Sequence, residues 1–199
     1  EERRNLLERL CAAQSKELPL RLSKQLFFEN WGNLSDLRAT ARSYHAEGLM
    51  IKKCKSLYGV GRKKGAWWKW KLDPLTIDAV MIYAQAGHGR RANLYTDFTF
   101  AVWQGNELVP FTKAYSGLSD AEFRDITVWV RKNTLQRFGP VRQVKPEHVF
   151  EIAFEGIHNS TRHKSGVALR FPRMARWRKD KSPQDANTLE DLKEFLNTY

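Results

Sequence analysis

The sequence contains few cysteines and no long apolar run, and these shortages exclude several classes of protein. Only Cys11 and Cys54 occur in 199 residues, and neither these nor the five histidines follow a metal-ligand spacing. Two isolated cysteines are typical of reduced cytosolic thiols. No apolar run approaches a membrane span, and the start, Glu-Glu-Arg-Arg, does not resemble a signal peptide. We therefore expect a cytoplasmic protein without a membrane partner or a zinc site.

Acidic residues are also scarce relative to basic ones. The 22 Asp and Glu residues face 34 Lys and Arg residues, which gives a formal net charge of +12. The excess gathers in two clusters, between Lys52 and Lys71 and between Arg162 and Lys181. Clustered cations favour a polyanionic partner whose binding weakens as salt rises. An acidic protein or an acidic membrane surface would also attract these cations, so charge alone leaves the partner open.

The stretch at 47–74 carries the most specific pattern. Two alternating segments, EGLMIK and WWKWKL, flank a loop that contains three glycines and several basic residues. A period of two places Lys69 and Lys71 on one face of the second strand, with the second and third tryptophans on the other. The same period places Glu47 on the side of the first strand that carries its leucine and isoleucine.

Two neighbouring lysines on a buried strand are costly unless an anion lies between them. A phosphate is the natural candidate, and Glu47 would then hold the divalent metal that usually accompanies it. The alternative is a surface strand whose lysine stems cover aromatic rings. The flanking glutamate and the basic loop favour the phosphate site.

The segments that flank the basic loop resemble those of a known superfamily. EG-hydrophobic-M-hydrophobic-K followed by W-x-K-x-K is similar to motifs IV and V of the nucleotidyltransferases that carry a covalent lysyl-nucleotide, which are ATP-dependent DNA ligases, RNA ligases and mRNA capping enzymes. The segment GVALRFPRMARWRKDK at 166–181 resembles motif VI of DNA ligases, RFPR followed by R-x-D-K. YAQAGHGRRANLYTDFTFAVW and FEGIHNSTRHKSGVALRFPR resemble, more specifically, bacterial ATP-dependent DNA ligases found with a helicase and an exonuclease.

Resemblance and pattern together predict an α+β chain with two parts. Residues 1–74 would be the C-terminal part of an adenylation (nucleotidyltransferase) domain, and the boundary falls at Asp73-Pro74 because proline cannot extend a central strand. Residues 75–199 would form an OB-fold β-barrel domain that carries motif VI. A chain that starts without methionine is expected to be a fragment of a longer protein.

The local patterns predict the elements of each part. In the first part we expect a helix at 2–14, a strand at 18–28 and a helix from Asn33 or Ser35 to Tyr44. In the second part we expect strands at 77–85, 94–103, 107–115, 147–154 and 166–171. A helix from Ser119 with a capping box would bury Phe123, Ile126, Val130 and Leu135, and a final helix would cover 188–199.

The resemblance implies nick sealing in duplex DNA through lysyl-AMP and DNA-adenylate, in DNA repair and recombination in the bacterial cytosol. ATP and Mg²⁺ (or Mn²⁺) would be the cofactors. The partners would be nicked duplex DNA, the N-terminal adenylation region of the same protein, and helicase or exonuclease repair proteins. Glu47 would be the metal-side carboxylate, and Lys69 and Lys71 would contact the α-phosphate.

The resemblance also implies roles for the other basic residues. Motif VI would close over the β- and γ-phosphates with Arg173, Arg178, Asp180 and Lys181. Nucleotide contacts would come from Glu47, Lys52, Arg62, Lys69, Lys71, Arg178 and Lys181. After a swing about a hinge near Asp73, DNA contacts would come from Arg62, Lys63, Arg90, Arg91, Arg162 and Lys164. Solvated loop charges are the alternative interpretation of each DNA candidate.

Two family motifs have no match in the sequence. Ligases present their nucleophile in K-x-D-G, but the nearest segment, KLDP at 71–74, has proline in place of glycine and lies inside W-x-K-x-K. The acidic motif III is not matched either. We therefore expect that these residues alone cannot form lysyl-AMP. The alternatives are a non-catalytic OB module that binds nucleic acid, and an RNA ligase or capping-type nucleotidyltransferase.

Overall fold

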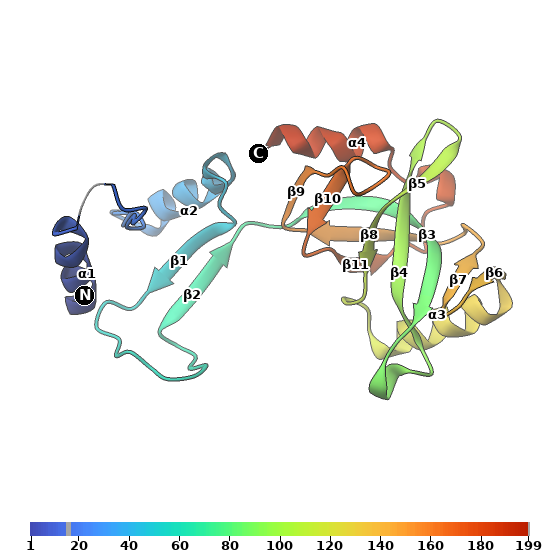
Figure 1. Ribbon diagram of the computed structural model, residues 1–199, viewed down its shortest axis with the longest axis horizontal. Helices are drawn as coiled ribbons and strands as arrows, with labels where there is room; N and C mark the ends of the chain where they lie inside the picture. The colour runs from blue at the N-terminus through green and yellow to red at the C-terminus, as the bar shows by residue number, and fades with distance from the viewer. Residues whose placement is uncertain (15–16, 199) are drawn as a thin grey trace. The chain divides into compact units, whose positions relative to one another are not determined.

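The computed structural model describes residues 1–14 and 17–198 and consists of two units, Glu1–Leu72 and Asp73–Tyr199. The units divide between Leu72 and Asp73, two residues before the end of the first predicted part. Each unit has its own sheet (Figure 1). Within the described residues, no helix has the length and apolar character needed to cross a membrane.

The first unit joins short helices to a two-stranded antiparallel sheet. Its elements are α1 (Glu2–Ala12), α2 (Trp31–Ala39), the 3-10 turn η1 (Ala41–Tyr44), β1 (Gly48–Lys52) and β2 (Trp67–Lys71). The helix predicted at 2–14 is confirmed. The second helix begins earlier than predicted, because the side chain of Asn30 accepts a hydrogen bond from the Asn33 N–H at 3.0 Å and caps it.

The strand predicted at 18–28 is wrong. These residues have no regular structure, and Leu18 and Leu20 are 45% and 60% exposed. Alternating leucines form a strand only where a neighbouring strand takes up their backbone hydrogen bonds. The small sheet of this unit consists of β1 and β2 alone among the described residues, so the segment at 18–28 has no such neighbour.

The second unit is built on a curled antiparallel sheet of the OB type. Its described part runs in the order β11-β8-β3-β4-β5, with β7 beside β3 and β6 beside β7. The strands are β3 (Leu75–Ala86), β4 (Tyr95–Gln104), β5 (Glu107–Ala114), β6 (Thr134–Phe138), β7 (Val141–Val144), β8 (Val149–Phe154) and β11 (Arg173–Trp177). A separate hairpin is formed by β9 (Gly156–Asn159) and β10 (Val167–Arg170).

The curl depends on the long strand β3. Its first half pairs with β8 and its second half with β7, and the register with β4 shifts between Met81 and Tyr83. A bulge of this kind bends a strand and increases its twist. The two halves of β3 therefore pair with different strands and run in different directions. The five predicted strands are confirmed, whereas β6, β7, β9 and β11 were not predicted.

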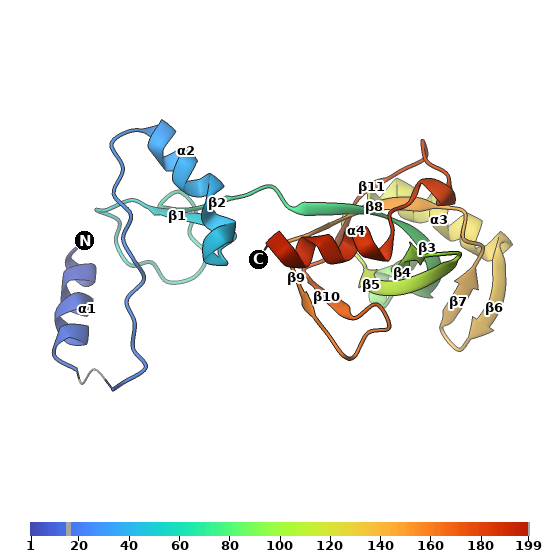
Figure 2. The same cartoon turned by 90° about the horizontal axis from the view of Figure 1, so that it is seen from above.

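Aromatic side chains fill the space inside the sheet. Phe98, Phe100, Phe111, Phe150 and Phe154 are at most 2% exposed. The described helices α3 (Asp120–Lys132) and α4 (Leu189–Glu194) lie at different ends of the barrel, and the short 3-10 turn η4 (Phe195–Thr198) follows α4 (Figures 1 and 2).

Both helices begin as predicted. The Ser119–Glu122 capping box starts α3, and the Thr188–Asp191 box starts α4. The predicted burial of Phe123, Ile126 and Val130 is confirmed, but Leu135 is 56% exposed because it belongs to β6.

Candidate active site

The first basic cluster lies on the β1–β2 sheet. Gly48 pairs with Lys71, Met50 with Lys69, and Lys52 with Trp67. Directly paired residues of an antiparallel sheet share a face, so Lys52, Lys69 and Lys71 project from one side. Leu49 and Ile51 pair with two tryptophans on the other side. The alternation therefore predicted the lysine face correctly.

Glu47 lies on the lysine side of the sheet, and the side predicted for it is wrong. Its Oε2 atom is 3.0 Å from Lys71 Nζ. The reason is Gly48, which has φ +139° and would bring a Cβ within 2.3 Å of the Trp70 carbonyl oxygen. Only glycine adopts this backbone conformation without strain. The irregular residue breaks the period of two and turns the glutamate toward the lysines.

Strand β2, which carries the two lysines, is not buried, although the prediction of a phosphate site assumed a buried strand. Lys69 is exposed, and the side chains of Lys71 and Glu47 are 39% and 29% exposed. Helix α2 supports the strand from behind, since Arg38 Nε donates to the Lys71 carbonyl at 2.9 Å. The Lys52 ammonium lies 4.3 Å from the centre of the Trp67 ring, a cation–π distance. The arrangement offers an open cationic surface with one carboxylate beside it.

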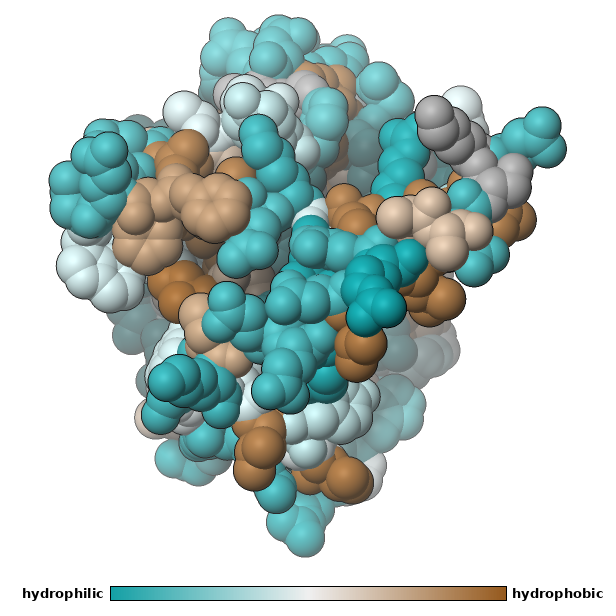
Figure 3. Space-filling model, turned by 90° about the vertical axis from the view of Figure 1, so that its left-hand side faces the viewer, coloured by the Kyte–Doolittle hydropathy of each residue, from teal (hydrophilic) through white to brown (hydrophobic). Residues whose placement is uncertain are grey.

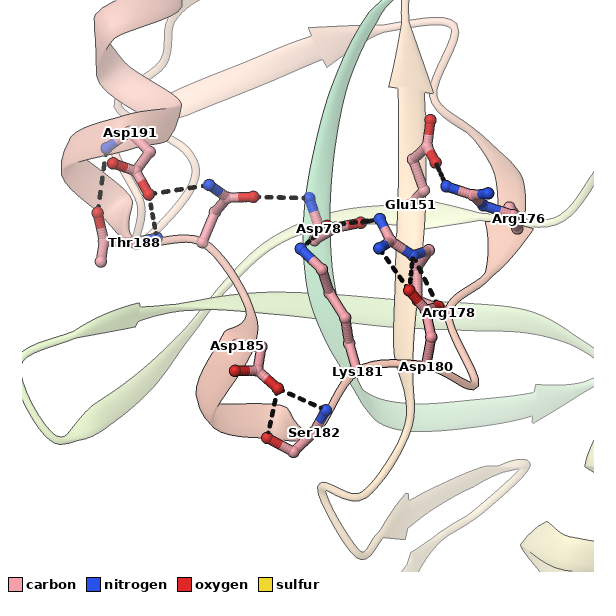
Figure 4. A network of polar contacts seen from close by, with 11 residues as sticks. Asp78, Glu151, Arg176, Arg178, Asp180, Lys181, Ser182, Asp185, Thr188 and Asp191 are labelled. Atoms are coloured by element: carbon pink, nitrogen blue, oxygen red, sulfur yellow. Dashed lines mark hydrogen bonds and ion pairs between the residues drawn. The ribbon is translucent and has the colours of Figure 1, made fainter.

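The last residues of the second basic cluster, Arg178 to Lys181, follow the end of β11 (Figure 4). Arg178 donates from Nε and Nη2 to the Asp180 carboxylate, at 2.9 and 2.7 Å, and from Nη1 to Asp78 Oδ2 at 3.0 Å. Lys181 Nζ lies 2.6 Å from the same Asp78 oxygen. The tight turn is held by the Lys181 N–H, which donates to the Arg178 carbonyl at 3.2 Å. The structure thus brings Arg178, Asp180 and Lys181 together.

Asp78 was missed by the sequence reasoning. It lies on β3 between buried apolar residues and is 8% exposed. A buried carboxylate is stable only when cations or hydrogen-bond donors surround it. Its signal in the sequence was one acid inside the apolar run LTIDAVMI. That signal marks a buried charge but does not identify its partner.

The hydrogen bonds between Arg178 and Asp180 shift the pKa values of both groups. The hydrogen bond to Asp180, strengthened by the charge of Asp78, raises the pKa of Arg178 above its usual value. The hydrogen bond from Arg178 holds the pKa of Asp180 well below its usual range. Both groups therefore stay charged at neutral pH, and the two cations of the cluster face two carboxylates.

Arg173 does not join the group formed by Asp78, Arg178, Asp180 and Lys181. Its Nη1 atom is 3.0 Å from Glu155 Oε1, near the turn at Phe171. The β11–β8 register shifts between Met174 and Arg176, so the arginines of β11 do not follow a simple alternation. A role for Arg173 beside Arg178 is a prediction without a contact to support it.

The candidate DNA contacts are all exposed side chains. Arg62 and Lys63 lie in the loop after β1, Arg90 and Arg91 in the 3-10 turn η2 (Gly89–Arg91), and Arg162 and Lys164 in the β9–β10 loop. Arg91 Nη2 contacts Asp120 at 2.9 Å. The β9–β10 loop closes through the Ser160 N–H, which donates to the Gly166 carbonyl at 2.8 Å.

No ready-made metal site accompanies either cluster. Within residues 1–14 and 17–198, no three carboxylate, histidine or cysteine side chains are grouped as metal ligands. Glu47 is the one predicted ligand, and its carboxylate contacts Lys71. A metal held here would need further ligands from a bound substrate or from water.

Two family models match the sequence. The model described as "ATP dependent DNA ligase domain" matches residues 1–71, and the model described as "ATP dependent DNA ligase C terminal region" matches residues 91–181. Each match lies within one unit of the structure.

Curated relatives agree with these matches. A "Probable DNA ligase" of Koribacter versatilis is 45% identical over 165 residues, which cover 83% of this chain and 29% of the relative. A "DNA ligase" of Thermococcus fumicolans is 33% identical over 196 residues, which cover 98% of this chain and 34% of the relative. The chain thus spans about a third of the length of these relatives.

Solved structures share the fold. A structure from a study of Lig E DNA ligases superposes with a TM-score of 0.63 at 20% identity, covering 89% of this chain and 57% of that chain. The ligase domain of LigD from M. tuberculosis gives a TM-score of 0.50 at 22% identity, covering 93% and 59%. At this level of identity the likeness concerns the fold alone.

Proposed function

The chain belongs to the ATP-dependent DNA ligase family, and on this premise we propose that a protein containing it seals nicks in duplex DNA. The single observation that carries the proposal is the face shared by Lys69 and Lys71, with Glu47 beside Lys71 at 3.0 Å. A paired set of cations next to a carboxylate suits a phosphate that is being transferred, because negative charge develops on its oxygens.

The proposed reaction has three steps. A lysine nitrogen loses a proton and bonds to the α-phosphorus of ATP, and the bond to the bridging oxygen breaks as pyrophosphate leaves. A 5′-phosphate oxygen of the nick then attacks the AMP phosphorus, and the lysine nitrogen leaves and recovers a proton. The 3′-hydroxyl finally attacks the 5′-phosphorus, loses its proton, and releases AMP. The sequence of this chain contains no K-x-D-G to supply the lysine.

The residues of β2 would act on the α-phosphate in these steps. Lys69, which is exposed, would contact it directly. Lys71, held by Glu47, would contribute charge from a fixed position. Lys52 on the same face and Arg62 in the following loop would extend the cationic surface toward the rest of the nucleotide.

Glu47 fits one ligand of a divalent ion, because Mg²⁺ is usually held by one or two carboxylates together with substrate phosphates. When bound, Mg²⁺ or Mn²⁺ would supply positive charge to those phosphates.

Motif VI and the loops would complete the cycle. Arg178 and Lys181 would contact the β- and γ-phosphates and orient the pyrophosphate, with Arg173 nearby. Asp180 would hold Arg178 before the phosphates bind. A hinge near Asp73, where the two units divide, would let the second unit exchange ATP for DNA. Arg62, Lys63, Arg90, Arg91, Arg162 and Lys164 would then contact the duplex backbone.

The cellular setting is a further part of the proposal. The segments that resemble ligases found with a helicase and an exonuclease support a role in DNA repair in a bacterial cytosol. Recovery of such enzymes with the tagged ligase from cells exposed to DNA damage would support this setting. A ligase that purifies alone under those conditions would count against it.

The test of function uses the full-length protein with ATP, Mg²⁺ and a nicked duplex. We expect sealing by the wild type, and a loss of about 10²-fold or more in Lys69→Ala, because a cation on the transferring phosphate is removed. Lys193→Ala, an exposed lysine on α4, is the matched control and should seal at the wild-type rate.

Two results would contradict the proposal. Salt-sensitive binding of the duplex without any sealing would favour the non-catalytic nucleic-acid-binding module. Sealing of nicked RNA in preference to nicked DNA, or transfer of GMP to an RNA 5′ end, would favour the RNA ligase or capping class.

A further inference from the structure

We infer that Asp78 is a positioning residue for motif VI, which holds Arg178 and Lys181 as a fixed pair of cations for the β- and γ-phosphates. The inference rests on the proposed function and adds a residue that lies outside motifs IV, V and VI. Asp78 belongs to β3, whereas both of its partners follow β11, about a hundred residues later in the chain.

One carboxylate oxygen determines the separation of the two cations. Asp78 Oδ2 accepts from Arg178 Nη1 at 3.0 Å and from Lys181 Nζ at 2.6 Å (Figure 4). Charge-assisted hydrogen bonds of this length are the strong and geometrically specific ones. The lysine has a flexible four-carbon stem, so a fixed anion is what keeps its ammonium beside the guanidinium.

Asp78 is itself fixed to the barrel. Its N–H donates to Asn187 Oδ1 at 2.9 Å, and its carbonyl accepts from the Asn187 N–H at 3.0 Å. Asn187 Nδ2 donates in turn to Asp191 at 3.0 Å, and Asp191 belongs to the cap of α4. The carboxylate therefore projects from a strand that is tied to a capped helix.

The neighbouring carboxylate provides an internal comparison. Asp78 and Glu151 are directly opposite each other on β3 and β8, and like charges at such positions repel. Each has its own cation: Glu151 contacts Arg176 at 3.1 Å, and that arginine is 63% exposed. Arg178, which contacts Asp78, is only 15% exposed. Of the two acids, Asp78 is the one whose cations, Arg178 and Lys181, are partly buried.

Two edges of the Arg178 guanidinium contact carboxylates, and these two carboxylates differ in solvent exposure. The edge made by Nε and Nη2 faces Asp180, whose side chain is 63% exposed, while Nη1 faces Asp78, whose side chain is 10% exposed. A phosphate arriving from solvent can replace Asp180 on the open edge, because that edge presents the two parallel donors that phosphates bind. Asp78 would remain in place and keep the arginine oriented.

The test compares three variants of the full-length protein, Asp78→Asn, Asp78→Glu and Glu151→Gln. The first reaction is self-adenylylation by ATP. Both its rate and the fraction of protein molecules that react are measured. The second is sealing of a nick that already carries AMP, which involves no β- or γ-phosphate. Glu151→Gln is the matched control, because it removes one carboxylate from the same row of the sheet.

For Asp78→Asn we expect the maximal rate of adenylylation to fall about tenfold or more, while sealing of the pre-adenylated nick stays within about threefold. The KM for ATP should not rise in proportion, because removal of a negative charge does not repel ATP. Asp78→Glu, which restores the charge one methylene away, should lie between wild type and Asp78→Asn. Glu151→Gln should match the wild type in both reactions.

The outcomes separate the two proposals. A wild type that does not react with ATP overturns the proposed function and this inference together. A reactive wild type with an Asp78→Asn variant that reacts equally fast overturns only the role of Asp78. An equal loss in both reactions indicates a general folding defect and also overturns it. If Asp78→Asn does not fold, Asp78→Glu decides: a wild-type rate of adenylylation there would overturn the positioning role.

Discussion

The two units of this chain are stabilised in different ways. Among the described hydrophobic residues of the first unit, only Leu34 and Ala41 are fully buried, whereas the second unit has a continuous aromatic and aliphatic core. Viewed from its own side, the first unit exposes apolar groups between hydrophilic ones (Figure 3). Phe27 is 84% exposed and Trp31 66% exposed. The second unit therefore has a core of its own, while the first depends on local turns and caps.

The largest expected difference between the units concerns core truncation. Phe100→Ala removes a fully buried ring whose centre lies 5.4 Å from that of Phe150. We expect it to lower the free energy of unfolding of the second unit by about 3–5 kcal/mol. Trp31→Ala, at an exposed position of the first unit, should cost about 1 kcal/mol or less. Urea denaturation followed by circular dichroism measures both variants. Equal losses of unfolding free energy would contradict the difference between the two units.

A smaller effect is expected where the first unit depends on a single backbone conformation. Gly48→Ala would place a Cβ 2.3 Å from the Trp70 carbonyl oxygen at φ +139°. We expect a cost of roughly 1–3 kcal/mol, seen as faster amide hydrogen exchange across β1 and β2. The second unit should be unaffected.

Gly61→Ala is the control for this prediction. Gly61 also has a positive φ, but no atom lies within 4 Å of its added Cβ. Its loop position leaves room for adjustment, so exchange in β1 and β2 should stay close to that of the wild type. Equal protection in Gly48→Ala and the wild type would show that the glycine does not set the Glu47–Lys71 arrangement.

The smallest effect concerns a helix cap and its pH dependence. The Ser119 hydrogen bonds lower the pKa of the Glu122 carboxyl below 4.5, its usual value. A lowered folded-state pKa stabilises the protein above the unfolded pKa, and this stabilisation is lost as pH falls through the folded one. Ser119→Ala should therefore cost about 1 kcal/mol at neutral pH and less near pH 3.

Urea titrations at the two pH values measure this prediction. Ser35→Ala, at an exposed position inside α2, is the control and should show no loss at either pH, because alanine is the better helix former. A cost of Ser119→Ala that stays the same at both pH values would exclude a contribution from the Glu122 charge.

Much of this molecule was predictable because its signals are local. The Ser119 and Thr188 caps, the alternating strands of the second unit and the common face of Lys69 and Lys71 all depend on residues a few positions apart. The strand predicted at 18–28 failed for the complementary reason. A strand needs a partner, and its own alternation does not provide one.

The family, the order of the motifs and the local elements could be read from the sequence, since each depends on residues within a short segment. Which charges meet depends instead on the tertiary fold. Glu47 turns toward Lys71 because Gly48 breaks the alternation, and Asp78 meets Arg178 and Lys181 because the segment after β11 passes β8 and reaches β3. Ion pairs act over a few ångströms of space, and the fold alone brings residues a hundred positions apart to that distance.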